Sequence, residues 1–157
     1  MQLSNIERLI KIAEDTFDFR NDDSQLNVTP EIIEQLQKIH PAAMSEETNE
    51  NGPIAWLLVI PTNEDLMKKF LANEINEREL FELTPLNIKY DSIYLCSALV
   101  LDEYRKKGIT KGLALNAIKK IQQNHPIKSL FVWTFSREGE LAAESIARST
   151  GLELFRK

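Results

Sequence analysis

The stretch IYLCSALVL (93–101), followed at once by DEYRKKGITKG (102–112), decides the fold of this chain. The first segment carries no charge and no clean alternation of polar and apolar side chains, which is typical of a strand buried on both faces. Apolar residues then recur at helical spacing from Ile109 to Ile121. The sequence therefore predicts a buried strand that passes through a short charged turn into an amphipathic helix.

The sequence after this helix repeats the alternation of strand and helix. We expect a strand at 130–135, a helix at 137–150 that ends at Gly151, and a final short strand at 152–155. Strands that alternate with helices are joined by right-handed crossovers into largely parallel sheets. The predicted fold class is therefore α/β (α+β), with a mixed, centrally parallel β-sheet flanked by helices on both faces.

The part of the chain before residue 93 predicts four helices and one strand. The first helix has the capping-box residues Ser4 and Glu7 at its start and the apolar stripe Ile6, Leu9, Ile10, Ala13 and Phe17. The second helix begins at Thr29-Pro30 and stops at Pro41. A buried strand at 54–60, a helix capped by Thr62 and Asp65 and a short helix at 77–83 follow. No repeat or linker interrupts this series, so we expect a single domain spanning residues 1–157.

The composition bounds the function. The chain has 157 residues, 43% of them hydrophobic, which suffices for one core without disulfides. Its net charge of -5 argues against a nucleic-acid partner. The apolar run 93–101 is too short to cross a bilayer and the N-terminus does not resemble a signal peptide, so we expect a cytoplasmic protein with no membrane partner. Two histidines and one cysteine, widely spaced, predict no metal site.

The turn between the strand and the helix concentrates the features of a phosphate site. A helix N-terminus presents unpaired N–H groups and a charge of about +0.5. Gly108 allows a tight turn and a close approach of the backbone to an anion. Four cationic side chains surround this glycine: Arg105, Lys106, Lys107 and Lys111. The sequence thus predicts a phosphate cradle at the C-terminal end of a buried strand, where open α/β sheets usually bind ligands.

The segment from Leu99 to Thr110 resembles the signature of the GNAT (GCN5-related N-acetyltransferase) superfamily, in which Arg or Gln, two residues, Gly, one residue and then Gly or Ala follow a strand. The resemblance implies that the chain transfers an acetyl group from acetyl-CoA to an amine acceptor, a small molecule or a peptide, by direct attack. It also implies the residues that bind coenzyme A. The strand backbone at Leu99, Val100 and Leu101 would pair with the pantetheine arm, and the turn Arg105, Lys106, Lys107, Gly108, Ile109, Thr110 and Lys111 would hold the pyrophosphate.

The chain departs from the family pattern in several places. Thr110 stands where the family usually has Gly or Ala, and Ala147 stands where a tyrosine often serves as the acid. Neither strand 93–101 nor strand 130–135 contains a carboxylate that would serve as the general base. Catalytic residues therefore remain unassigned, and the nearest candidates in the sequence are the carboxylates Asp91, Asp102, Glu103 and Glu140 and the tyrosines Tyr94 and Tyr104.

These departures leave two alternatives to an enzyme: a non-catalytic, CoA-binding regulatory module, and an interaction protein that kept the fold and lost the cofactor. A short final strand would leave a sheet edge open, so a homodimer is also an expectation. Cys96, Trp56 and Trp133 lie in predicted buried strands, and we expect them to pack in the core.

Overall fold

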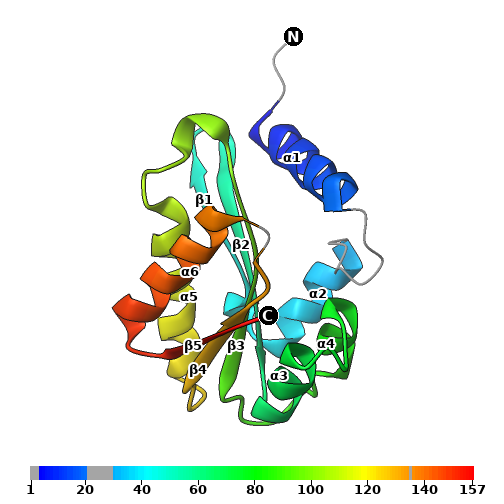
Figure 1. Ribbon diagram of the computed structural model, residues 1–157. Coiled ribbons are helices and arrows are strands. Elements are labelled where there is room, and N and C mark those ends of the chain that lie inside the picture. Colours follow the sequence, from blue (N-terminus) through cyan, green and yellow to red (C-terminus); the bar gives the residue numbers. More distant parts are fainter. Residues whose placement is uncertain (1–3, 21–29, 135) are drawn as a thin grey trace.

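The computed structural model describes residues 4–20, 30–134 and 136–157, without the side chains of residues 14 and 16–20 (Figure 1). Within these residues the chain forms a five-stranded sheet in the order β1-β2-β3-β4-β5. The strands are β1 Met44–Asn49, β2 Gly52–Thr62, β3 Ser92–Val100, β4 Ser129–Val132 and β5 Glu153–Arg156. The helices are α1 Asn5–Arg20, α2 Pro30–Ile39, η1 Pro41–Ala43, α3 Glu64–Leu71, α4 Glu77–Leu83, η2 Asp102–Tyr104, α5 Ile109–Gln122 and α6 Arg137–Thr150.

The sheet is mixed, and the prediction of a centrally parallel sheet was wrong. Strands β3, β4 and β5 are parallel, as the alternation of strands and helices predicted. Strands β1, β2 and β3 are antiparallel, so the central strand β3 has one neighbour of each kind. The reason is that α3 and α4 return the chain to the end of the sheet that it has just left, which places Ser92 opposite Thr62.

Helices cover both faces of the sheet, as predicted. Figure 1 shows α5 and α6 on one side of the sheet and α1, α2, α3 and α4 on the other. The first strand, β1, was missed because its sequence MSEETN is polar, and a polar strand at a sheet edge carries no hydrophobic pattern.

The local signals at helix ends were mostly correct. Gly151 ends α6 in the left-handed conformation with φ 72°, and the Glu7 amide donates to the Ser4 hydroxyl. Helix α3 begins differently from the prediction, because the side chain of Asn63 accepts from the Leu66 amide and is the cap, in place of Thr62 and Asp65. The predicted cap Thr29 lies outside the described residues.

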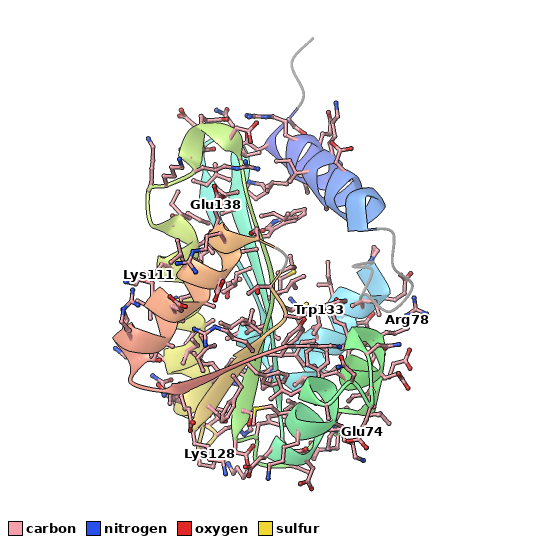
Figure 2. All side chains as sticks on the ribbon, in the orientation of Figure 1. Glu74, Arg78, Lys111, Lys128, Trp133 and Glu138 are labelled. Atoms are coloured by element: carbon pink, nitrogen blue, oxygen red, sulfur yellow. The ribbon has the colours of Figure 1, made fainter. Side chains whose placement is uncertain are left out.

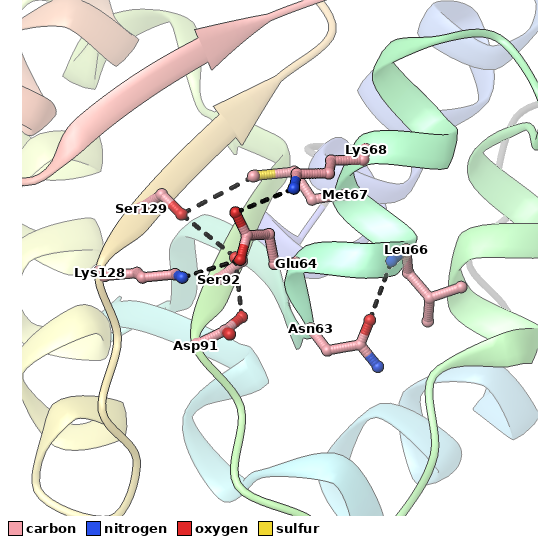
Figure 3. Close-up of polar contacts among 9 residues, drawn as sticks. All are labelled: Asn63, Glu64, Leu66, Met67, Lys68, Asp91, Ser92, Lys128 and Ser129. Carbon is pink, nitrogen blue, oxygen red and sulfur yellow. Dashed lines mark hydrogen bonds and ion pairs between the residues drawn. The ribbon is translucent and has the colours of Figure 1, made fainter.

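Strands β3 and β4 are paired at one end of β3 but not at the other. At the paired end, the buried hydroxyls of Ser92 and Ser129 are 3.2 Å apart, and Lys128 forms a 2.8 Å ion pair with Glu64 of α3 (Figure 3). The pairing then ends with Leu95 opposite Val132.

Beyond that point β3 continues to Val100 with β2 as its partner. The predicted strand 130–135 is thus shorter, ending at Val132, and residue 135 lies outside the described part. The prediction that 93–101 is buried throughout fails in its second half, where Ala98 is exposed, because β4 no longer covers that edge.

Helix α1 packs on the same half of the sheet where β3 has lost β4. Leu9 is fully buried against Ile54 and Leu101. The predicted stripe was wrong at Ile6 and Ile10, which are 48% and 44% exposed, because the helix turns Leu9 and the partly buried Ile12 to the sheet instead. The side chain of Phe17 is outside the described part.

Two charge-assisted hydrogen bonds tie this helix to the turn after β3. The guanidinium of Arg8 donates to both carboxylate oxygens of Glu103, over 2.7 and 2.6 Å. This contact lowers the pKa of Glu103 to about 2. Because the folded pKa lies below the ordinary value of 4.5, the stabilisation is fully present above pH 4.5 and is lost as the pH falls toward 2.

We therefore expect Glu103→Gln to lower the urea midpoint at pH 6, and the difference from the wild type to shrink between pH 4.5 and about 2. Both midpoints are measured by circular dichroism across this range. Arg8→Gln serves as the matched variant, since it removes the other partner, and the double variant should be no less stable than either single one. A difference that stays constant with pH would contradict the assigned role of this ion pair.

Candidate functional site

The turn before α5 has the backbone geometry of an anion site. Lys106 and Gly108 both adopt positive φ angles, 62° and 77°, and Gly108 occupies the N-cap position without a side-chain cap. The first backbone hydrogen bond of the helix runs from the Gly112 amide to the Gly108 carbonyl. In the described part of the chain, the amides of Ile109, Thr110 and Lys111 therefore have no acceptor, and they point out of the helix N-terminus.

The residues before these amides carry cationic side chains, and the turn is open to solvent. Arg105 pairs with Asp102 at 3.3 Å, and the Lys107 ammonium lies 5.9 Å from the centre of the Tyr104 ring. A Cβ added at Gly108 would meet no atom within 4 Å, so the space beside the turn is free for a ligand. The structure thus brings together the predicted residues Arg105, Lys106, Lys107, Gly108, Ile109, Thr110 and Lys111.

The edge of β3 that has lost β4 presents backbone groups in a defined register. The Leu101 amide donates to the Ile54 carbonyl, so Leu101 and, by alternation, Leu99 direct their backbone groups toward β2. Ala98 and Val100 direct theirs toward the opposite, open edge. Among the three predicted pantetheine partners, the geometry therefore favours Val100, and it adds Ala98, which sequence analysis missed because the register depends on the partner strand.

Each of the four candidate carboxylates already has a polar partner. Asp102 pairs with Arg105, Glu103 with Arg8, and Glu140 with both Arg137 and Arg156, whereas Asp91 accepts from the Ser92 hydroxyl. Glu103 is also a weak base, because its pKa is about 2. The hydroxyl of Tyr104 accepts from the amide of Asn49 at 2.9 Å.

The other candidate tyrosine, Tyr94, forms a buried pair with a carboxylate that the sequence did not single out. Its hydroxyl donates to Glu77 Oε2 over 2.6 Å, and the two residues are 0% and 3% exposed. Glu77 is the first residue of α4, where acidic residues are common on solvated surfaces, so its spacing gave no sign of burial. Phe70 and Phe131 stack against Tyr94 and separate this pair from solvent.

A cavity of about 540 Å³ opens next to this aromatic cluster, where β4 ends. Its lining comprises Asn73, Glu74, Ile75, Asn76, Glu79, Trp133 and Lys157. Trp133, which we expected in the core, directly follows the last residue of β4 and forms one wall. Glu74, between α3 and α4, and Glu79, in the first turn of α4, bring carboxylates to the lining. Sequence analysis missed both because an exposed acidic residue at a helix start or in a loop gives no signal of a site.

A second cavity, of about 340 Å³, lies beside the first turns of α5. It is lined by Glu47, Ile54, Tyr104, Ile109, Gly112, Leu113 and Asn116. The cavity at Trp133 and the cationic turn lie on opposite faces of the sheet: Figure 2 shows Trp133 and Glu74 on the side of α3 and α4, and Lys111 on the side of α5. The β3 edge at Ser97 to Val100 lies between them, and this run spans roughly 10 Å.

The described residues form neither a metal-ligand cluster nor a membrane-spanning helix. Across 4–20, 30–134 and 136–157, no three histidine, cysteine, aspartate or glutamate side chains converge as metal ligands would. None of the helices in these ranges combines the length and the apolar character needed to span a bilayer.

The buried pair predicts an unequal cost for removing two tyrosine hydroxyls. Tyr94→Phe should destabilise the protein by about 1–3 kcal/mol, because it removes a hydrogen bond to a carboxyl group that is itself buried. Tyr90→Phe is the matched control: its hydroxyl donates to the neutral Pro85 carbonyl over 2.6 Å, so its loss should cost about 0.5–1.5 kcal/mol. Urea denaturation at pH 7 measures both, and equal costs would show that the Glu77 contact carries no special weight.

Comparisons with known proteins leave the function to be argued from this geometry. No family model, no curated protein and no solved structure matches the chain.

Proposed function

We propose that this protein is a GNAT-like acyltransferase that transfers an acetyl group from acetyl-CoA to an amine. One observation carries the proposal: the pairing of β3 with β4 ends at Leu95, and β3 then leads, through a turn with three cationic residues, into a helix N-terminus without a side-chain cap. An open strand edge suits an extended, amide-containing arm, and a helix N-terminus suits a pyrophosphate. The two features are continuous in the chain and have the order that coenzyme A requires.

In this proposal the cofactor lies along β3. The amides of Ile109, Thr110 and Lys111 bind the pyrophosphate, and the cationic side chains of the turn add charge. The backbone groups of Ala98 and Val100 pair with the pantetheine amides, much as a further strand would. The thioester then lies where the two strands part, near Leu95 and Val132.

The reaction is a direct substitution at the thioester carbonyl. The neutral amine of the acceptor attacks, a C–N bond forms, and the C–S bond of the tetrahedral intermediate breaks. The coenzyme A thiolate leaves and takes up the proton that the amine has lost, so that the products are an amide and free coenzyme A. Backbone donors of the open β3 edge stabilise the negative charge that develops on the carbonyl oxygen.

A non-catalytic CoA-binding module is the second candidate, and one observation favours it. All four carboxylates that the sequence offered as bases are engaged by other side chains. The two functions differ in turnover. Release of the coenzyme A thiol in the presence of an amine panel supports the enzyme, whereas cofactor binding with no thiol release for any amine supports the module.

Cofactor binding predicts a change in melting temperature, and one variant distinguishes an effect on acetyl-CoA affinity from an effect on the stability of the free protein. At 100 times its dissociation constant a ligand stabilises by about 2.7 kcal/mol, and each kcal/mol raises the melting temperature by roughly 2–4 °C in a domain of this size. Acetyl-CoA should therefore raise the melting temperature of the wild type by several degrees. Thr110→Asp should raise the melting temperature of the free protein slightly, because a carboxylate complements the helix N-terminus, but should reduce the shift with acetyl-CoA.

Gln37→Glu is the matched control for this experiment. It makes the same change in net charge on an exposed position of α2, on the opposite face of the sheet from α5, and should leave the acetyl-CoA shift unchanged. Absence of any shift in the wild type at millimolar acetyl-CoA would favour the third alternative, an interaction protein without a cofactor.

A further inference from the structure

We infer that the cavity at the end of β4 is a binding site for a primary ammonium group, and that the Lys157 ammonium occupies its aromatic corner in the free protein. The inference deepens the proposed function, on which its assignment as the acceptor site rests. The chemistry of the cavity supports it in three steps.

The first step is the position of the Lys157 ammonium over two aromatic rings. Its nitrogen lies 4.3 Å from the ring centre of Phe70 and 4.8 Å from that of Trp133, both within the range of cation–π attraction. The two rings are 6.4 Å apart at an angle of 75°, so they form two walls of a corner that both face the cation. Phe70 is fully buried, which fixes one wall in the core.

The second step is the charge of the lining. Glu74 and Glu79 are the acidic residues among those that line the cavity, and Lys157 is the basic one. Without the lysine side chain, the lining would carry two negative charges and no positive charge, an arrangement that attracts cations and repels anions. Glu79 is held in place because its Oε1 accepts from the Asn76 amide at 3.1 Å in the capping box of α4.

The third step is that Lys157 can leave without unfolding the site. The backbone of Lys157 is anchored by a hydrogen bond of 2.9 Å from its amide to the Val132 carbonyl, which continues the pairing of β5 with β4. Only the side chain enters the cavity, and rotation about its own bonds is enough to withdraw it. The volume of about 540 Å³ exceeds the space of one ammonium head and falls in the range of small-molecule sites.

An ammonium ligand that binds at the corner of Phe70 and Trp133 must displace the Lys157 ammonium. The apparent dissociation constant is the intrinsic one divided by the fraction of molecules with an empty site. Lys157 thus raises the acceptor concentration that is needed to fill the site. Because Trp133 follows Val132, where β4 parts from β3, the occupied corner lies beside the place that the proposed function gives to the thioester.

The test measures binding without a cofactor. In a Trp56→Phe background Trp133 is the remaining tryptophan, and its fluorescence is followed during titration with n-pentylamine or, as the neutral analogue, n-pentanol at pH 7. We expect the amine to bind and the alcohol to bind much more weakly. Lys157→Met keeps the side-chain length without the charge and should tighten amine binding by about 3- to 30-fold.

Two further variants sharpen the result. Glu79→Gln should weaken amine binding several-fold while α4 stays intact, because glutamine also completes a capping box. Lys120→Met removes the same charge from an exposed position of α5 and should change nothing. The inference would be overturned if the amine and the alcohol bound equally well. It would also be overturned if Lys157→Met and Lys120→Met had the same effect on amine binding.

The outcome is separable from that of the proposed function. Amine binding in a protein that shows no melting shift with acetyl-CoA would keep the ammonium site and remove the acyltransferase. A shift with acetyl-CoA in a protein whose Trp133 does not respond to the amine would keep the cofactor site and remove this inference.

Discussion

The backbone hydrogen bonding of β3 is the constraint on which the other features depend. A strand in the middle of a sheet must satisfy donors and acceptors along two edges, and among the described residues β3 has strand partners on both edges only up to Leu95. The hydrogen bond from the Lys128 amide to the Asp91 carbonyl and the Ser92–Ser129 contact join the two strands at one end, and their pairing stops at the other. An extended ligand can complete the edge that β4 leaves, which is why the open half of β3 is the centre of the proposed site.

The same strand links two environments of opposite charge. Beyond Val100 the chain enters a turn with four cationic side chains and unpaired helix amides, although the protein as a whole is acidic. Beside the end of β4 lies a corner of aromatic rings with two carboxylates. Anionic and cationic groups would thus be bound on opposite faces of one sheet (Figure 2).

Local patterns predicted the elements that obey local rules. Helix α6 with its Gly151 cap and helix α4 were placed to within a residue, because apolar spacing and capping chemistry act over a few positions. Helix α5 begins at the predicted residue, Ile109, but ends at Gln122, before the predicted stop at 124–126. Sequence patterns failed where a neighbouring element determines whether a segment is a strand or which side of a helix is buried. β1 is polar yet forms a strand because β2 offers its edge, and α1 buries Leu9 while leaving Ile6 exposed because the sheet meets another side of the helix.

The sequence by itself determined that a buried strand leads through a cationic, glycine-containing turn into a helix, since all of these residues lie within twenty positions of one another. It also predicted the parallel order of the last three strands, because strands and helices alternate along that part of the chain. Only the tertiary structure decided that β4 stops at Val132, that Ala98 and Val100 face the open edge, and that Glu77, Trp133 and Lys157 gather around α3 and α4. These relations join residues far apart in the chain, and register and packing between distant segments leave no periodic trace in a single sequence.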